Sequence, residues 1–163
     1  MNRPPLVIES WTPEHPRWEK LVELIGKEGQ TDWALDPYFA RFSRHFLVAQ
    51  RADKLVGFLM FVHWEIGPHD RKAPKLQLSG ETLTEAKVLA FGVPKPFRRQ
   101  GVGRALQERT IERARELGCY QVRSVSEVDH GDNHQLKLSL GFAVEPMERP
   151  TPTFAFIMPL RDR

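Results

Sequence analysis

The stretch VPKPFRRQGVGRAL, at Val93–Leu106, decides the fold because it joins a strand pattern to a helix pattern through a glycine turn. The apolar run Ala86–Val93 predicts a strand that the prolines at 94 and 96 end. The segment Gly101–Leu117 carries apolar and charged residues at helical spacing, and Gly118 follows as a helix-ending glycine. Tyr120–Val125 then predicts a second strand. A strand, a helix and a strand in this order indicate a βαβ unit with two parallel strands.

The glycine turn predicts a binding site for a compact anion. Unpaired backbone N–H groups and the positive end of the helix dipole meet where the helix begins. Gly101 and Gly103 allow an anion to approach the backbone closely, and Arg98, Arg99 and Arg104 supply charged donors around them. Together these features indicate a pyrophosphate as the ligand.

Two other glycine motifs do not fit the spacing of this turn. A P-loop needs a Lys followed by Ser or Thr directly after its second glycine, and neither pair follows Gly103. The dinucleotide-binding fingerprint has a third glycine where this chain has Leu106. An ordinary glycine turn with solvated arginines is the alternative. The three arginines and the βαβ context favour the anion site.

The rest of the chain predicts further strands and helices on both sides of the βαβ unit. Before the unit we expect a strand, an amphipathic helix, a helix starting at Asp36-Pro37 and a hairpin, and after it a short helix and two strands. These segments are Leu6–Trp11, Arg17–Lys27, Phe46–Gln50 with Leu55–Val62, Asn133–Leu140, Ala143–Glu145 and Phe154–Met158. His69–Lys72 is expected to be a solvated loop. No repeat or linker divides the chain, so the sequence predicts one mixed α/β domain over residues 1–163.

Composition and charge argue against several other classes of protein. The 163 residues include 24 Lys and Arg against 21 Asp and Glu, a net charge of only +3 with both signs interspersed. Nucleic-acid binders usually concentrate their basic residues on one face, so this pattern does not favour such a partner. The single cysteine, Cys119, excludes an intramolecular disulfide framework. We see neither an apolar run long enough for a membrane span nor a signal peptide, and we expect a cytoplasmic protein.

The turn and its surroundings resemble the GNAT superfamily of N-acetyltransferases, which binds acetyl-CoA. Arg98–Gly103 matches the R/Q-x-x-G-x-G/A signature of that family. Phe91–Pro94 resembles its bulged fourth strand, and Asn133 followed by Leu140–Phe142 resembles its "N…LGF" ending. The resemblance implies a single-domain GNAT-like α/β fold. Its central sheet would be mixed and mostly antiparallel, with a parallel βαβ unit at its centre and helices on both faces.

The resemblance also implies a binding site for acetyl-CoA. Loop amides would hold the coenzyme pyrophosphate, while the backbone at Phe91 and Val93 would pair with the pantetheine arm and polarise the thioester carbonyl. Gly92, without a side chain, would ease the approach of that arm. Asn133 would lie near the pantetheine or pyrophosphate, or would cap a helix, or both. The cofactor-binding residues expected in this way are Phe91, Val93, Arg98, Arg99, Gln100, Gly101, Val102, Gly103, Arg104 and Asn133.

The expected reaction is direct attack of a primary amine, on a small molecule or peptide, on the thioester. The amine must first lose a proton, and family members often use a glutamate on the fourth strand as the base. The commonest position of that glutamate falls on Lys87, so we assign the role to Glu85, two residues earlier on the same strand face. Many relatives carry a tyrosine as the general acid where this chain has Lys137. A thiol with a pKa near 8.5 can leave as the thiolate, so transfer does not require that acid.

We expect no metal site in this chain. His130 and His134 flank Asp132, but Gly131 argues against the continuous helix that an i, i+4 histidine pair needs. No third ligand with the spacing of a metal site accompanies them.

Two other functions remain as alternatives to an acetyltransferase. Lys137 at the position of the acid and Lys87 at the usual position of the base are also compatible with a non-catalytic acyl-CoA-binding or sensor domain. Such a domain would bind the coenzyme and release no thiol. The basic pI of about 9.2 motivates a nucleic-acid-binding module, which we rank lower. As partners we expect an amine substrate, no nucleic acid and no membrane, and the sequence is compatible with a homodimer.

Overall fold

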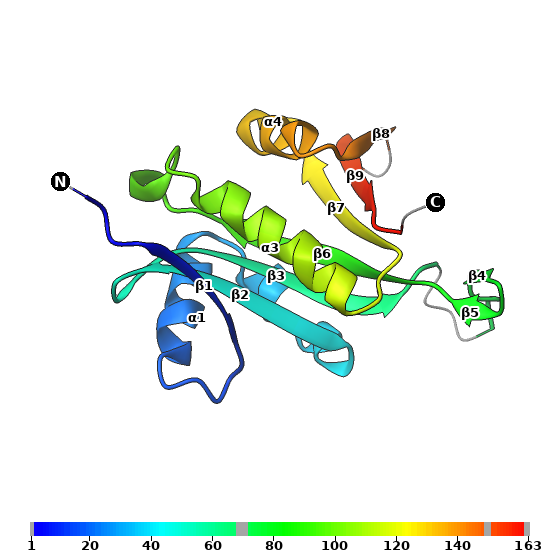
Figure 1. Cartoon of the computed structure of the whole chain (residues 1–163), viewed down its shortest axis with the longest axis horizontal. Helices are drawn as coiled ribbons and strands as arrows, with labels where there is room; N and C mark the ends of the chain where they lie inside the picture. Colours follow the sequence, from blue (N-terminus) through cyan, green and yellow to red (C-terminus); the bar gives the residue numbers. More distant parts are fainter. Residues whose placement is uncertain (1, 68–71, 149–150, 162–163) are drawn as a thin grey trace. The chain divides into compact units, whose positions relative to one another are not determined.

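The computed structural model describes residues 2–67, 72–148 and 151–161, which form two compact units. Unit 1 comprises Met1–Val62 and Val88–Thr110, and unit 2 comprises His63–Lys87 and Ile111–Arg163 (Figure 1). The strands of the main sheet follow the order β1-β2-β3-β6-β7-β9-β8, with β6 and β7 as its parallel pair. This topology confirms the predicted fold class, whereas the single-domain organisation stays a prediction.

Unit 1 holds the strands and helices up to Val62, near the end of β3, together with the turn that leads into α3. Its elements are β1 (Leu6–Trp11), α1 (Trp18–Lys27), α2 (Thr31–Ala34), the 3-10 helix η1 (Pro37–Arg41), β2 (Ser43–Arg51) and η2 (Lys95–Phe97). It shares β3 (Lys54–Glu65), β6 (Thr84–Gly92) and α3 (Val102–Glu116) with unit 2. The Asp36 side chain accepts a hydrogen bond of 2.8 Å from the N–H of Tyr38, which confirms the predicted helix start at Asp36-Pro37.

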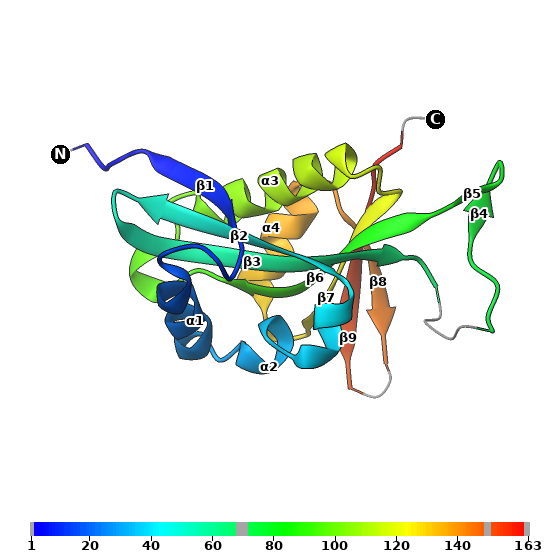
Figure 2. The same cartoon turned by 90° about the horizontal axis from the view of Figure 1, so that it is seen from below.

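The core of unit 1 lies on both faces of β3. Gly57 faces the first half of α3, because a Cβ built on it would lie 2.9 Å from the side chain of Val102. Its neighbour Phe58 points to the opposite face, where its ring packs against Gly92 and near Glu28, which follows α1. Figure 2 shows the same arrangement, with α1 on one side of β3 and α3 on the other. The alternation of a strand thus places α3, and the glycine turn before it, on a fixed face.

Unit 2 is built around an antiparallel sheet of β7, β9 and β8. These strands span β7 (Gln121–Glu127), β8 (Ala143–Met147) and β9 (Thr153–Pro159), and α4 spans Gly131–Ser139. The predicted end of α3 is confirmed in detail: Gly118 has φ +76, and hydrogen bonds run from Gly118 N to Arg115 O and from Cys119 N to Ala114 O. This pair of bonds is a Schellman motif, which turns the chain out of the helix toward β7.

Most of the predicted elements are present within a few residues of their expected ends. One hairpin was missed, β4 (Gln77–Leu78) with β5 (Glu81–Thr82), because two-residue strands leave no alternating apolar pattern. β6 begins earlier than predicted, at Thr84, so Glu85 lies inside the strand. Of the loop expected at His69–Lys72, the part 69–71 lies outside the described residues. None of the helices in the described part of the chain has the length and apolar character to cross a membrane.

Candidate active site

The glycine turn of unit 1 has the conformation that an anion site needs. Gly101 has φ +82 and directly precedes α3, and its carbonyl accepts the N–H of Ala105 at 3.0 Å. The first N–H groups of a helix have no partner within the helix, so those of Val102 and Gly103 point out of its end. A Cβ built on Gly101 would meet nothing within 4 Å. The space beside Gly101 is therefore open to a ligand that approaches the start of α3.

The arginines around this turn do not all serve as free donors. Arg98 turns back, and its Nε donates to the carbonyl of Val93 at 2.7 Å. Arg104 forms an ion pair with Glu108, one helical turn further on, at 3.0 Å. Arg99 is exposed, has a left-handed φ of 59°, and its side chain bonds to no other described residue. Arg99 is thus the arginine best placed to bind an anion without breaking an existing contact.

Two hydrogen bonds that involve Gln100 fix the loop ahead of α3. The side chain of Gln100 donates to the carbonyl of Pro96 at 3.0 Å, and Arg51 donates to the carbonyl of Gln100 at 3.4 Å. These bonds anchor the peptides on both sides of Arg99. The predicted residues Arg98–Gly103 and Val93 therefore belong to one hydrogen-bonded loop.

The backbone of β6 at Phe91, expected to pair with a ligand, is occupied by Gln30. The Gln30 carboxamide donates to the carbonyl of Phe91 at 2.7 Å and accepts its N–H at 2.8 Å. Gly92 also differs from expectation, because a Cβ on it would lie 2.7 Å from the ring of Phe58. This glycine is required by the packing of Phe58, and its role in the approach of a ligand stays a prediction. Sequence reasoning missed Gln30, which lies 61 residues from its partner.

In unit 2, Glu85 is fully buried in a network of donors. Its carboxylate accepts hydrogen bonds from Trp64 at 2.9 Å, from Gln121 at 2.8 Å and from Arg123 at 2.6 Å. Burial acts to raise the pKa of Glu85, but the bonds from Arg123 and Gln121 outweigh it and hold the pKa below its ordinary value. The carboxylate is therefore ionised and strongly engaged, which weakens it as a proton acceptor.

Two lysines, Lys87 and Lys137, lie near this network, and neither has an ion pair with a carboxylate among the described residues. Burial lowers the pKa of Lys87 to about 7, and the charges of Arg123 and Lys137 add to the shift against the attraction of Glu85. Burial alone lowers the pKa of Lys137 to about 8. Lys137 donates to the hydroxyl of Ser124 at 2.7 Å, while Lys87 has no hydrogen bond or ion pair among the described residues. Both amines titrate near neutral pH, a property that the sequence could not reveal because it depends on burial.

Asn133 lies within α4 and not at its start. The N-cap of α4 is His130, so the interpretation of Asn133 as the helix cap is wrong. Its side-chain oxygen Oδ1 is buried and has no hydrogen-bond partner among the described groups. An unpaired buried oxygen costs free energy unless a ligand or water donates to it. This oxygen is therefore a candidate contact for a ligand that carries an N–H or O–H group.

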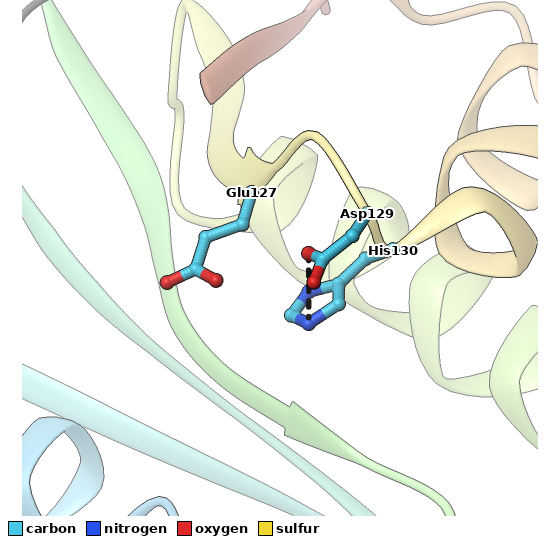
Figure 3. A group of neighbouring side chains, drawn as sticks. All are labelled: Glu127, Asp129 and His130. Carbon is cyan, nitrogen blue, oxygen red and sulfur yellow. Dashed lines mark ion pairs between the residues drawn. The ribbon is translucent and has the colours of Figure 1, made fainter. Parts of the chain in front are cut away.

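Three further residues could offer ligands to a metal ion. Glu127, Asp129 and His130 extend from the end of β7 into the loop before α4, with their ligand atoms within 4.8 Å of one another (Figure 3). All three are exposed, and His130 Nε2 lies 3.7 Å from Asp129 Oδ1. His134, which we paired with His130 in the sequence, instead shares a hydrogen bond with Ser126. Exposed acidic groups beside a histidine are common without an ion, and the group defines no metal centre by itself.

The fold and the turn together define a class of α/β protein in which a glycine turn follows the first strand of the parallel pair and begins a helix. A family model described as the Acetyltransferase (GNAT) family matches residues 7–142. The chain therefore belongs to the GNAT family, whose reaction class is acetyl transfer. No curated protein matches the chain.

Several solved structures share the fold at low sequence identity. NAA60 of Arabidopsis thaliana, in complex with acetyl-CoA, gives a TM-score of 0.74 at 14% identity and covers 96% of this chain and 99% of its own. Ard1 from Thermoplasma volcanium gives 0.66 at 22% identity, over 96% and 99% of the two chains. The protein yncA from Salmonella typhimurium, with its cofactor acetyl-CoA, gives 0.66 at 16% identity, over 97% and 95%. At these identities the likeness shows the fold.

Proposed function

We propose that this protein transfers the acetyl group of acetyl-CoA directly to a primary amine of a small molecule or peptide. The observation that carries the proposal is the start of α3, where Gly101 adopts φ +82 and a Cβ on it would meet nothing within 4 Å, so an anion can approach the first N–H groups of the helix. Membership of the GNAT family and the acetyl-CoA bound to NAA60 and yncA support the same cofactor.

The residues of unit 1 fit this coenzyme at two points. The N–H groups of Val102, Gly103 and Arg104 would hold the pyrophosphate, with Arg99 as the free charged donor. The peptide groups of Phe91, at the end of β6, and of Val93, directly after it, would pair with the pantetheine amides once Gln30 releases Phe91 and Arg98 releases the carbonyl of Val93. Asn133, whose buried Oδ1 has no partner among the described groups, stays a proposed contact for the coenzyme by resemblance to the family. When bound, the coenzyme supplies an activated acetyl thioester.

The acceptor amine must lose a proton before it can attack. Glu85 stays our proposed base, although its ion pair with Arg123 lowers its basicity. An exchange of Glu85 for Gln separates the two roles that this carboxylate could have. If Glu85 is the base, the substitution changes the acidic limb of the pH–rate profile. If Glu85 serves only as the partner of Arg123, the substitution changes the stability of the protein and leaves that limb in place.

Departure of the coenzyme thiol does not need a dedicated acid. A thiol of this kind has a pKa near 8.5 and leaves readily as the thiolate. Lys137, at the family's tyrosine position, is buried and bonded to Ser124, with a pKa of about 8. We therefore propose no residue as the general acid.

The expected cytoplasmic location and the expected homodimer stay predictions.

Thermal unfolding with acetyl-CoA tests the cofactor, with ATP and a short DNA duplex as controls. A ligand at about 100 times its Kd stabilises a protein by about 2.7 kcal/mol. For a domain of this size, about 2–4 °C per kcal/mol predicts a shift of several degrees. A rise with acetyl-CoA alone supports the proposal, and no rise at millimolar coenzyme overturns it. A rise with DNA alone would favour the nucleic-acid-binding alternative.

A sensor domain is the second candidate, because the carboxylate of Glu85 is saturated by its neighbours. Such a domain would bind acetyl-CoA and release no thiol in the presence of amines. Turnover with a panel of amines and peptides therefore separates the two functions.

A further inference from the structure

The carboxamide of Gln30 imitates a neighbouring strand at Phe91. A residue inside a ladder can exchange two hydrogen bonds with its partner, one from its N–H and one to its C=O. Gln30 makes both of these bonds through one side chain, at 2.8 Å and 2.7 Å. A carboxamide can do this because it carries a donor and an acceptor side by side, as a peptide group does. The edge of β6 at Phe91 is therefore shaped for a planar amide.

The main chain of Gln30 is anchored, while its side chain can rotate. Gln30 lies between α1 and α2, where its N–H bonds to the carbonyl of Ile25 at 3.1 Å and its carbonyl accepts the N–H of Ala34 at 2.9 Å. Its side chain is partly exposed to solvent. A change of side-chain rotamer can thus release Phe91 without moving the backbone of either segment.

We propose that Gln30 is a displaceable substitute for the pantetheine arm, and that it thereby sets the affinity for acetyl-CoA. This inference rests on the proposed function, because it assigns the edge of β6 at Phe91 to the coenzyme. While Gln30 holds that edge, the coenzyme gains contacts there only by breaking two existing hydrogen bonds. Gln30 therefore acts as a positioning residue of the site, and its removal favours the coenzyme.

A purely structural glutamine would behave in the opposite way. If Gln30 only maintained the shape of β6, its truncation would lower both the stability of the free protein and its affinity for the coenzyme. If Gln30 competes with the coenzyme, truncation lowers stability and raises affinity. The opposite signs of the two effects distinguish the roles.

The test compares Gln30→Ala with Gln30→Glu and with Gln135→Ala, an exposed glutamine on α4, as the matched control. Isothermal titration with acetyl-CoA gives Kd, and thermal unfolding without ligand gives stability. We expect Gln30→Ala to bind about 10-fold more tightly, equivalent to about 1.4 kcal/mol, and to unfold at a lower temperature. Gln30→Glu keeps an acceptor for the Phe91 N–H but has no donor for its carbonyl, so its affinity should lie between those of wild type and Gln30→Ala.

Each outcome of this test has a distinct meaning. Equal or weaker binding by a folded Gln30→Ala overturns the inference while the proposed function stands. Absence of acetyl-CoA binding by the wild-type protein overturns the proposed function itself. If the alanine variant does not fold, the side-chain NH2 signal of Gln30 in the wild-type NMR spectrum decides. The chemical shift of this signal should move toward the value of a solvent-exposed carboxamide on addition of acetyl-CoA. An unchanged chemical shift contradicts displacement of the Gln30 side chain.

Discussion

Replacing Gly101 by alanine separates the backbone strain of the turn from its role in binding. Gly101 has φ +82, a region that costs an L-residue roughly 1–2 kcal/mol. No atom lies within 4 Å of the added Cβ, so this strain is the whole expected loss of stability. At about 2–4 °C per kcal/mol, the melting temperature should fall by about 2–8 °C.

Gly118 provides a matched control at the other end of α3. It has φ +76, and a Cβ on it also meets nothing within 4 Å. Gly118→Ala should therefore lose about as much stability as Gly101→Ala. Its position after the last turn of the helix places it away from the unpaired N–H groups.

The two variants should differ only in their affinity for acetyl-CoA. A methyl group in front of the N–H groups of α3 keeps the pyrophosphate from close approach, and a hydrogen bond to a charged group contributes about 1.5–3 kcal/mol. We expect Gly101→Ala to bind acetyl-CoA about 10- to 100-fold more weakly and Gly118→Ala to bind like the wild type, measured by isothermal titration. Wild-type affinity in a folded Gly101→Ala would refute the anion site, and an equal loss in both variants would show a general effect of strain.

The remaining predictions concern the charges of unit 2. Arg123→Met should lower the free energy of unfolding, measured in urea, by about 3–5 kcal/mol, because it leaves the carboxylate of Glu85 buried without its cation. Adding Glu85→Gln should restore part of this loss. A loss below about 1 kcal/mol in Arg123→Met would contradict a stabilising ion pair. The pKa of Lys87 falls from 10.5 to about 7 on folding, so the folded state binds fewer protons between these pH values and stability rises with pH across them. Lys87→Met should therefore be more stable than wild type at pH 7 and lose this advantage toward pH 10, whereas parallel pH profiles would show that Lys87 keeps an ordinary pKa.

Local features of the site could be read from the sequence because they depend on neighbouring residues. The turn before α3, the left-handed Gly101 and the helix end at Gly118 follow from glycine spacing and helical periodicity. The strand at Phe91 and its end before Pro94 follow in the same way.

Long-range contacts at the site could not be read from the sequence. The partner of Phe91 is Gln30, and nothing in the pattern around either residue indicates that they meet. The sequence around Glu85 indicates only that it lies in a strand. Its contacts with Arg123 and Trp64 arise when the chain folds and buries it. The lowered pKa of Lys87 has the same origin, because desolvation depends on how the chain packs.

The most direct test of the central claim is the release of free thiol from acetyl-CoA on addition of a panel of primary amines and peptides. Mass spectrometry identifies and quantifies the acetylated product. Cys119 is buried, and burial raises the pKa of its thiol, so a native protein blank accounts for its small background. We predict thiol and N-acetylated amine in equal amounts for at least one acceptor, and, at a coenzyme concentration below the wild-type Kd, about 10- to 100-fold less of both with Gly101→Ala, in line with its weaker affinity. Tight binding of acetyl-CoA without amine-dependent thiol release from any acceptor would contradict the account and identify a sensor.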